Sequence, residues 1–111
     1  MMTQTVKTKS YPVSIFIAGD ITQIEAACQG YCDSEGYCVT VTPTNYIFTG
    51  GHEEGAIIGL INYGRFPAEP ETILARSRKI ADQLLNLVGG QESCSIQSPD
   101  STIWLSRRDF L

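Results

Sequence analysis

The amino-acid sequence predicts an α+β fold with two layers, in which two helices pack on one predominantly antiparallel sheet of about six strands. Three observations lead to this fold class. Two segments, 21–35 and 70–88, repeat apolar residues at helical spacing. Six shorter segments are apolar, alternating or β-branched, as strands are. Short turns rich in Gly, Pro and Ser separate neighbouring strand segments, which favours antiparallel pairing. The expected order is β-α-β-β-β-α-β-β.

The first strand and the first helix have clear boundaries. Residues 11–18 end in a nearly continuous apolar run, which is typical of a buried strand. Asp20, with Gln23 three residues later, resembles a capping box, and Gly36 is a typical helix stop. The helix should bury a stripe formed by Ile21, Ile24, Ala27, Cys28, Tyr31 and Cys32.

Three strands are expected between the helices, at 37–42, 45–49 and 56–63. Pro43 and Thr44 predict a short turn between the first two, and the Gly-rich residues 50–55 predict a hairpin loop. The strand at 56–63 is the most apolar and should lie inside the sheet.

The second helix should begin near Pro70, because proline suits a first helical turn. It should end at Gly89 and Gly90. Its expected buried stripe is Ile73, Ser77, Ile80, Ala81, Leu84 and Val88. Two last strands, 93–97 and 102–106, are joined by a predicted turn at 98–101.

The domain organisation follows from length and composition. Residues 1–10 are polar and are expected to be disordered, and residues 11–111 are expected to form a single ligand-binding domain. Charged residues make up only 18% of the chain, below the roughly 25% of an average soluble domain. This favours a homo-oligomer, in which another copy covers part of the surface.

The charge distribution restricts the partners. A net charge of −4 argues against binding to long nucleic acids. No Lys or Arg lies between Lys9 and Arg65, so an anionic ligand would have to meet the later basic residues. The longest apolar stretch, 56–61, is far short of the ~20 residues of a membrane span. No signal peptide is recognisable, and the expected location is cytoplasmic.

The sequence predicts no catalytic residue, metal site or cofactor. The four cysteines, Cys28, Cys32, Cys38 and Cys94, lack the paired spacing of zinc sites, and buried structural thiols are the favoured interpretation over a metal site or a disulfide. The single histidine, His52, has no evident partner for acid–base catalysis and is interpreted as a surface turn residue.

Two segments remain as candidates for ligand binding. In the first, Asn62, Arg65 and Phe66 combine an amide, a guanidinium and an aromatic ring in one loop, which suits a nucleotide. The alternative is that Tyr63 and Phe66 close the core while Arg65 covers them. In the second, the residues are Trp104, Arg107, Arg108 and Asp109. An Arg pair after a strand suits a pyrophosphate, and the alternative is a frayed charged tail.

The same segments carry a family resemblance. Residues 16–20, 37–44 and 57–63, together with Arg108 and Asp109, resemble the first Thoeris anti-defence family of bacteriophages. The resemblance implies a non-enzymatic sponge that sequesters a cyclic ADP-ribose isomer in the host bacterial cytoplasm, and that in some members also holds cyclic oligonucleotides. It implies a dimer or a hexamer, with Arg108 and Asp109 in the ligand site. No cofactor is implied.

Two other functions stay open. The same arginines, with His52, are compatible with a small oligomeric enzyme acting on a phosphorylated or nucleotide-like metabolite. A module that blocks a host protein through an edge strand is the third reading.

Overall fold

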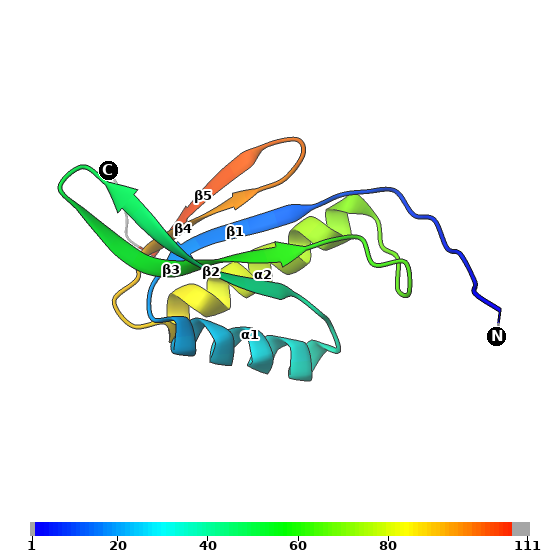
Figure 1. Ribbon diagram of the computed structural model, residues 1–111, viewed down its shortest axis with the longest axis horizontal. Helices are drawn as coiled ribbons and strands as arrows, with labels where there is room; N and C mark the ends of the chain where they lie inside the picture. The colour runs from blue at the N-terminus through cyan, green and yellow to red at the C-terminus, as the bar shows by residue number, and fades with distance from the viewer. Residues whose placement is uncertain (1, 108–111) are drawn as a thin grey trace.

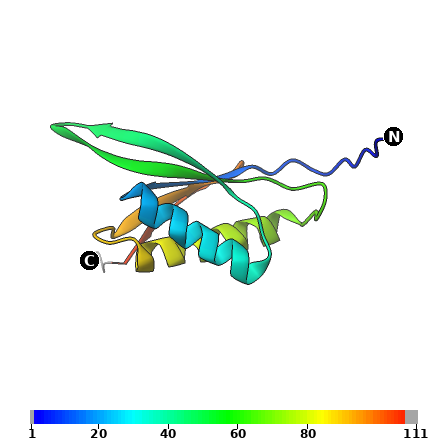
Figure 2. The same ribbon diagram turned by 60° about the horizontal axis from the view of Figure 1, so that its bottom comes forward.

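The computed structural model describes residues 2–107, which form two layers. A five-stranded antiparallel sheet, in the order β2-β3-β1-β4-β5, carries both helices on one face (Figures 1 and 2). The elements follow the chain as β1 (Val13–Ala18), α1 (Ile21–Glu35), β2 (Thr40–Phe48), β3 (Gly51–Leu60), α2 (Pro70–Leu87), β4 (Ser93–Gln97) and β5 (Thr102–Ser106). The predicted α+β class is confirmed, with five strands in the described residues where about six were expected.

The difference in strand number arises at Pro43. The turn predicted there does not form, and β2 runs unbroken through Pro43, which pairs with Ala56 of β3. Because β2 is an edge strand, only one of its two sides has a neighbouring strand to bond, and an edge strand tolerates the missing N–H of proline.

The β2–β3 hairpin is longer than the rest of the sheet. Strand β1 pairs with β3 only as far as Ala18 and Gly55, whereas β2 pairs with β3 as far as Phe48 and Gly51. Residues 45–54 therefore have no strand partner except each other and form a projecting arm, visible at the left of Figure 1. At the base of the arm, the Gly19 N–H donates to the Glu54 carbonyl at 2.8 Å. The loop predicted at 50–55 is wrong, because Gly50, with φ 87°, makes the turn and β3 begins at Gly51.

Helix α1 begins and ends as the sequence predicts, whereas α2 ends at Leu87, just before the predicted Gly89 and Gly90. The Asp20 carboxylate accepts hydrogen bonds from the main-chain N–H groups of Thr22 at 2.7 Å and Gln23 at 3.2 Å. Gly36 caps α1 in the left-handed conformation. The predicted stripe of α2 is buried in full, and the core lies between the helices and the inner face of β1, β3 and β4. None of the helices within residues 2–107 has the length and apolar character needed to cross a bilayer.

The cysteines divide into two environments. Cys28 and Cys94 are buried, and burial raises the pKa of each thiol from 9.0 to about 11. Cys32 is half-buried and Cys38 is exposed. The prediction of buried thiols is therefore wrong for Cys38, because β2 begins only at Thr40 and Cys38 lies in the preceding connection.

Residues 2–12 contain no helix or strand and run along the loop that follows β3. Thr8 donates to the Asn62 carbonyl at 3.3 Å, and the Asn62 side-chain amide donates to the Lys9 carbonyl at 2.8 Å. The expected division into residues 1–10 and a domain at 11–111 stays a prediction.

Candidate functional site

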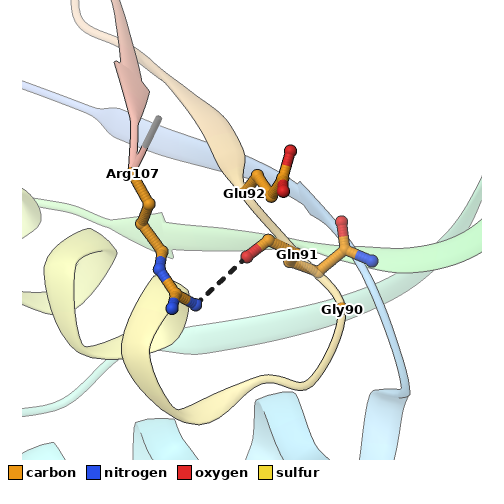
Figure 3. A pocket seen from close by; sticks show the side chains of 4 residues that line it. All are labelled: Gly90, Gln91, Glu92 and Arg107. Atoms are coloured by element: carbon orange, nitrogen blue, oxygen red, sulfur yellow. Dashed lines mark hydrogen bonds between the residues drawn. The ribbon is translucent and has the colours of Figure 1, made fainter. Parts of the chain in front are cut away.

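A polar pocket of about 330 Å³ lies at the end of the sheet where β1 and β5 terminate (Figure 3). It is lined by Gly90, Gln91, Glu92 and Arg107. The volume is at the lower end of the range typical of small-molecule sites. We call this feature the Arg107 pocket.

Arg107 is held by the C-terminal end of α2. Its guanidinium Nη1 donates to the main-chain carbonyl of Leu85 and, at 3.4 Å, to that of Gln91 (Figure 3). Its own main-chain N–H donates to the Glu92 carbonyl at 2.7 Å. Helix α2 has no basic residue in its last turn, so Arg107 supplies the positive charge that a helix C-terminus favours. The guanidinium is thereby positioned before any ligand arrives.

Beside the pocket, the turn after β1 packs closely against the turn after α2. Gly19, with φ 143°, follows β1, and a Cβ at this position would lie 2.7 Å from Val88 Cγ1. Gly89 donates its N–H to the Gln23 side chain at 2.8 Å, which ties the end of α2 to the first turn of α1. The turn that leads to Glu92 passes through Gly90, with φ 80°. Gly19 therefore lets the Val88 side chain pack directly against the turn after β1, whereas Gly90 meets nothing within 4 Å and is needed for its left-handed backbone conformation.

The pocket offers two opposite charges at separate positions. In Figure 3 the Arg107 guanidinium turns toward the end of α2, whereas the Glu92 carboxylate points to the other side of the pocket. A guanidinium recognises carboxylate or phosphate oxygens, and a carboxylate attracts ammonium or sulfonium groups. The arrangement therefore suits a ligand that carries both signs of charge.

The predicted ligand residues do not converge on this pocket. Val13 of β1 pairs with Leu60, just before Asn62, whereas Ala18 lies at the end of the sheet where Arg107 leaves β5. Asn62 and Arg107 thus lie at opposite ends of a six-residue strand, roughly 20 Å apart. Trp104 is 55% exposed on the sheet face away from the helices. Arg108 and Asp109 lie outside the described residues.

Asn62 organises its own loop. Its side-chain amide donates to the carbonyl oxygens of Lys9 and Ala68, at 2.8 and 3.1 Å, and its side-chain oxygen accepts from the Ala68 N–H at 2.9 Å. The Asn62 side chain therefore joins the N-terminal segment to the start of the connection to α2. It also lines a groove of about 360 Å³ with Lys7 and Lys9.

Phe66 belongs to an aromatic cluster. Its ring centroid lies 5.2 Å from that of Tyr63 and 5.9 Å from that of Tyr37. The Arg76 guanidinium of α2 lies 4.6 Å above the centroid of the Tyr37 ring. Burial raises the pKa of Tyr37, and the nearby Arg76 partly offsets this. These contacts match only in part the alternative in which Tyr63 and Phe66 close the core under Arg65, because Phe66 is 39% exposed and Arg65 is exposed.

The sequence interpretation missed Glu92 and Gln91. Gly89 and Gly90 predict only the end of α2, although a carboxylate between a helix end and a strand is itself a usable signal of a site. The position of Glu92 beside Arg107 depends on β5 returning beside β4, a contact between residues distant in sequence.

No protein-family model matches this sequence, and no curated protein matches it. Two solved structures share the fold over their full length. A phage SAM lyase in the apo state superposes with a TM-score of 0.69 at 12% identity, covering 100% of both chains. A phage SAM lyase in complex with S-methyl-5′-thioadenosine superposes with a TM-score of 0.65 at 11% identity, again covering 100% of both chains.

This likeness corrects the expectation that the chain is not an enzyme, because proteins that share its whole fold are lyases. Membership of the Thoeris anti-defence family is not confirmed, although the similar structures are phage proteins and one binds a nucleoside. The TM-scores of 0.69 and 0.65 establish a common fold, and at identities of 12% and 11% they establish the fold alone. The chain therefore has the fold of phage SAM lyase.

Proposed function

We propose that this chain is an enzyme that binds S-adenosylmethionine in the Arg107 pocket and cleaves it to S-methyl-5′-thioadenosine. The observation that carries the proposal is the pocket itself, in which a positioned guanidinium and a separate carboxylate occur on a fold shared with phage SAM lyase. The alternative from the sequence, a small enzyme acting on a nucleotide-like metabolite, is thus favoured over sequestration.

The chemistry of the substrate matches the two charges. S-adenosylmethionine carries a carboxylate, an ammonium group and a sulfonium group. The positioned Arg107 guanidinium suits the carboxylate, because planar N–H donors bind two carboxylate oxygens together. Glu92, on the other side of the pocket, suits a cationic group. The two residues together would fix the direction in which the amino-acid part of the substrate lies.

Cleavage breaks the bond between sulfur and the γ-carbon of the four-carbon chain. Both bonding electrons go to sulfur, which becomes the neutral thioether of S-methyl-5′-thioadenosine. The four-carbon fragment then follows one of two routes. Its own carboxylate oxygen donates an electron pair to the γ-carbon and closes a ring, or the β-carbon loses a proton and a double bond forms between the β- and γ-carbons. Glu92 is the carboxylate of the pocket that could accept such a proton. The structure of the second product distinguishes the two routes.

A cyclic ADP-ribose-type nucleotide is the second candidate substrate. Its pyrophosphate would meet Arg107, and the predicted ligand residues Arg108 and Asp109 follow directly in sequence. A cyclic oligonucleotide is a third ligand to test. Action against host defence, location in the host cytoplasm and assembly of several copies remain parts of the proposal.

Chromatography of reaction mixtures tests the function. Purified protein incubated with S-adenosylmethionine should convert it to an equal amount of S-methyl-5′-thioadenosine, faster than heat-inactivated protein does. Parallel incubations contain the cyclic ADP-ribose isomer. Loss of S-adenosylmethionine no faster than with the heat-inactivated protein would exclude the proposal. Conversion of the cyclic nucleotide, with no conversion of S-adenosylmethionine, would replace it with the second candidate.

Matched arginine variants then locate the site. Arg107→Ala should lower kcat/KM by roughly 10- to 100-fold, the effect of losing a charged hydrogen bond. Arg65→Ala removes an exposed arginine at the opposite end of the sheet and should leave kcat/KM unchanged. Equal losses in both variants, with circular dichroism showing both folded, would place the reaction elsewhere.

A further inference from the structure

The arm formed by residues 45–54 presents apolar side chains with no covering element. Ile47 is 84% exposed and Phe48 is 51% exposed, the arm lying beyond both helices (Figure 2). The base of the arm is fixed, since the Tyr46 hydroxyl donates to the Ala56 carbonyl at 2.6 Å. An isolated two-stranded hairpin is marginally stable in water, so a hairpin with an apolar tip gains stability from a partner.

An apolar groove of about 310 Å³ lies at the opposite edge of the sheet, between α2 and strands β4 and β5. Its apolar lining is Leu74, Ala75, Ile96 and Ile103, and its charged residues are Glu71 and Arg78. Ile103 is only half-buried, because the two helices do not cover the last strand fully. We call this feature the α2–β5 groove.

The side chains of the arm match the groove in chemistry and spacing. Ile47 is paired with His52, and Glu54 is two positions along β3 from His52, so strand alternation places Ile47 and Glu54 on one face of the arm. Such a diagonal pair is about 7 Å apart. In the groove, Leu74 and Arg78 lie one helical turn apart, about 6 Å. The arm therefore offers an apolar side chain, Ile47, next to an acid, Glu54. The groove offers an apolar side chain, Leu74, at a similar distance from a base, Arg78.

The groove of the same chain is out of reach of the arm. The arm extends from β2 and β3, and β2 and β5 are the two opposite edges of the sheet. Four strand spacings of about 4.8 Å separate those edges. The acidic segment between Lys9 and Arg65 also has no basic residue of its own to pair with. Any docking of the arm into this kind of groove joins two molecules.

We propose that the arm of one copy docks into the α2–β5 groove of a second copy, with Ile47 as the apolar anchor and Glu54 opposite Arg78. Two different surfaces meet in such a contact, so the assembly is a closed ring or an open chain, not a dimer with one shared patch. The inference does not depend on the reaction catalysed. Glu71, one turn before Leu74, sets the orientation, because it would repel a Glu54 placed at its end of the groove.

Sedimentation velocity of the full chain tests the assembly. The wild type should associate, and Ile47→Asp should raise the dissociation constant roughly tenfold or more, as removal of an interface anchor does. Val6→Asp is the matched control, since Val6 is 64% exposed outside the arm and the groove, and it should associate as the wild type does.

A charge exchange tests the specific pair. Glu54→Lys and Arg78→Glu should each weaken association, and the double variant should recover it, because the two charges are then opposite again. A monomeric wild type at every concentration would overturn the inference. Association that none of the three single variants changes would overturn it as well and would assign the contact to the uncovered sheet face around Trp104. Both outcomes are judged from association alone, so neither requires a measurement of catalytic activity.

Discussion

The guanidinium of Arg107 donates to the main-chain carbonyl of Leu85 in the last turn of α2. These residues are 22 positions apart in sequence, and the bond joins the end of β5 to the end of a helix. One side chain therefore both satisfies carbonyl groups that the helix leaves unpaired and presents a positive charge to the pocket.

This double role predicts a loss of stability in Arg107→Ala. The variant leaves the α2 carbonyls without their charged donor, and the free energy of unfolding should fall by about 1–2 kcal/mol. Arg107→Lys keeps the charge and should recover part of the loss. Urea denaturation followed by circular dichroism measures both. Lys79→Ala, which removes an exposed ammonium 4.0 Å from Glu35, is the control and should change stability by less than ~0.5 kcal/mol.

Two glycines should respond in opposite directions to alanine. A Cβ at Gly55 would lie 2.4 Å from the Ile17 carbonyl oxygen and 2.6 Å from Ala18 Cα, both main-chain atoms of β1. Gly55→Ala should therefore cost about 2–4 kcal/mol or prevent folding. A Cβ at Gly30, within α1, meets nothing within 4 Å, so Gly30→Ala should stabilise by up to about 1 kcal/mol. Thermal unfolding of the pair gives the comparison, and a stable Gly55→Ala protein would contradict the close β1–β3 approach.

The cap of α1 predicts a graded series at Asp20. Asp20→Ala removes the acceptor for the N–H groups of Thr22 and Gln23 and should cost about 1 kcal/mol. Asp20→Asn retains a side-chain oxygen, so its free energy of unfolding should fall by only a few tenths of a kcal/mol. Denaturation midpoints of the three proteins should fall in the order wild type, Asn, Ala. Equal midpoints would show that the cap contributes nothing to folding.

The thiols should differ in reactivity and in their effect on the pH dependence of stability. At pH 8 a thiol of pKa about 11 is thiolate in about one molecule in a thousand, so Cys28 and Cys94 should react with a disulfide reagent only after unfolding, whereas exposed Cys38 reacts first. Both raised pKa values mean that the unfolded chain releases thiol protons more readily. Stability should therefore fall as the pH rises from about 9, the unfolded value, to about 11, the folded value.

A Cys28→Ala, Cys94→Ala double variant tests the second part. Its free energy of unfolding should depend less on pH in the window from 9 to 11 than that of the wild type. An identical slope in the two proteins would mean that the buried thiols do not control this dependence.

The sequence alone determined the helices, the last two strands and the fold class. Local signals carry these features, since Asp20 and Gly36 bound α1 and apolar periodicity marks the buried stripe of α2. It did not determine whether Pro43 would interrupt a strand, because that depends on β2 being an edge strand, a property of the whole sheet.

Only the tertiary structure decided which predicted ligand residues come together. Residue type makes both Asn62 and Arg107 candidates for ligand binding, but the antiparallel order of β3, β1, β4 and β5 places them at opposite ends of the sheet. The same order brings Arg107 to the end of α2 and beside Glu92. Residue types that suit a ligand are local properties of a sequence. A site, in contrast, is a set of contacts between distant segments, and here the strand order sets the contacts of Arg107 with the end of α2 and with Glu92.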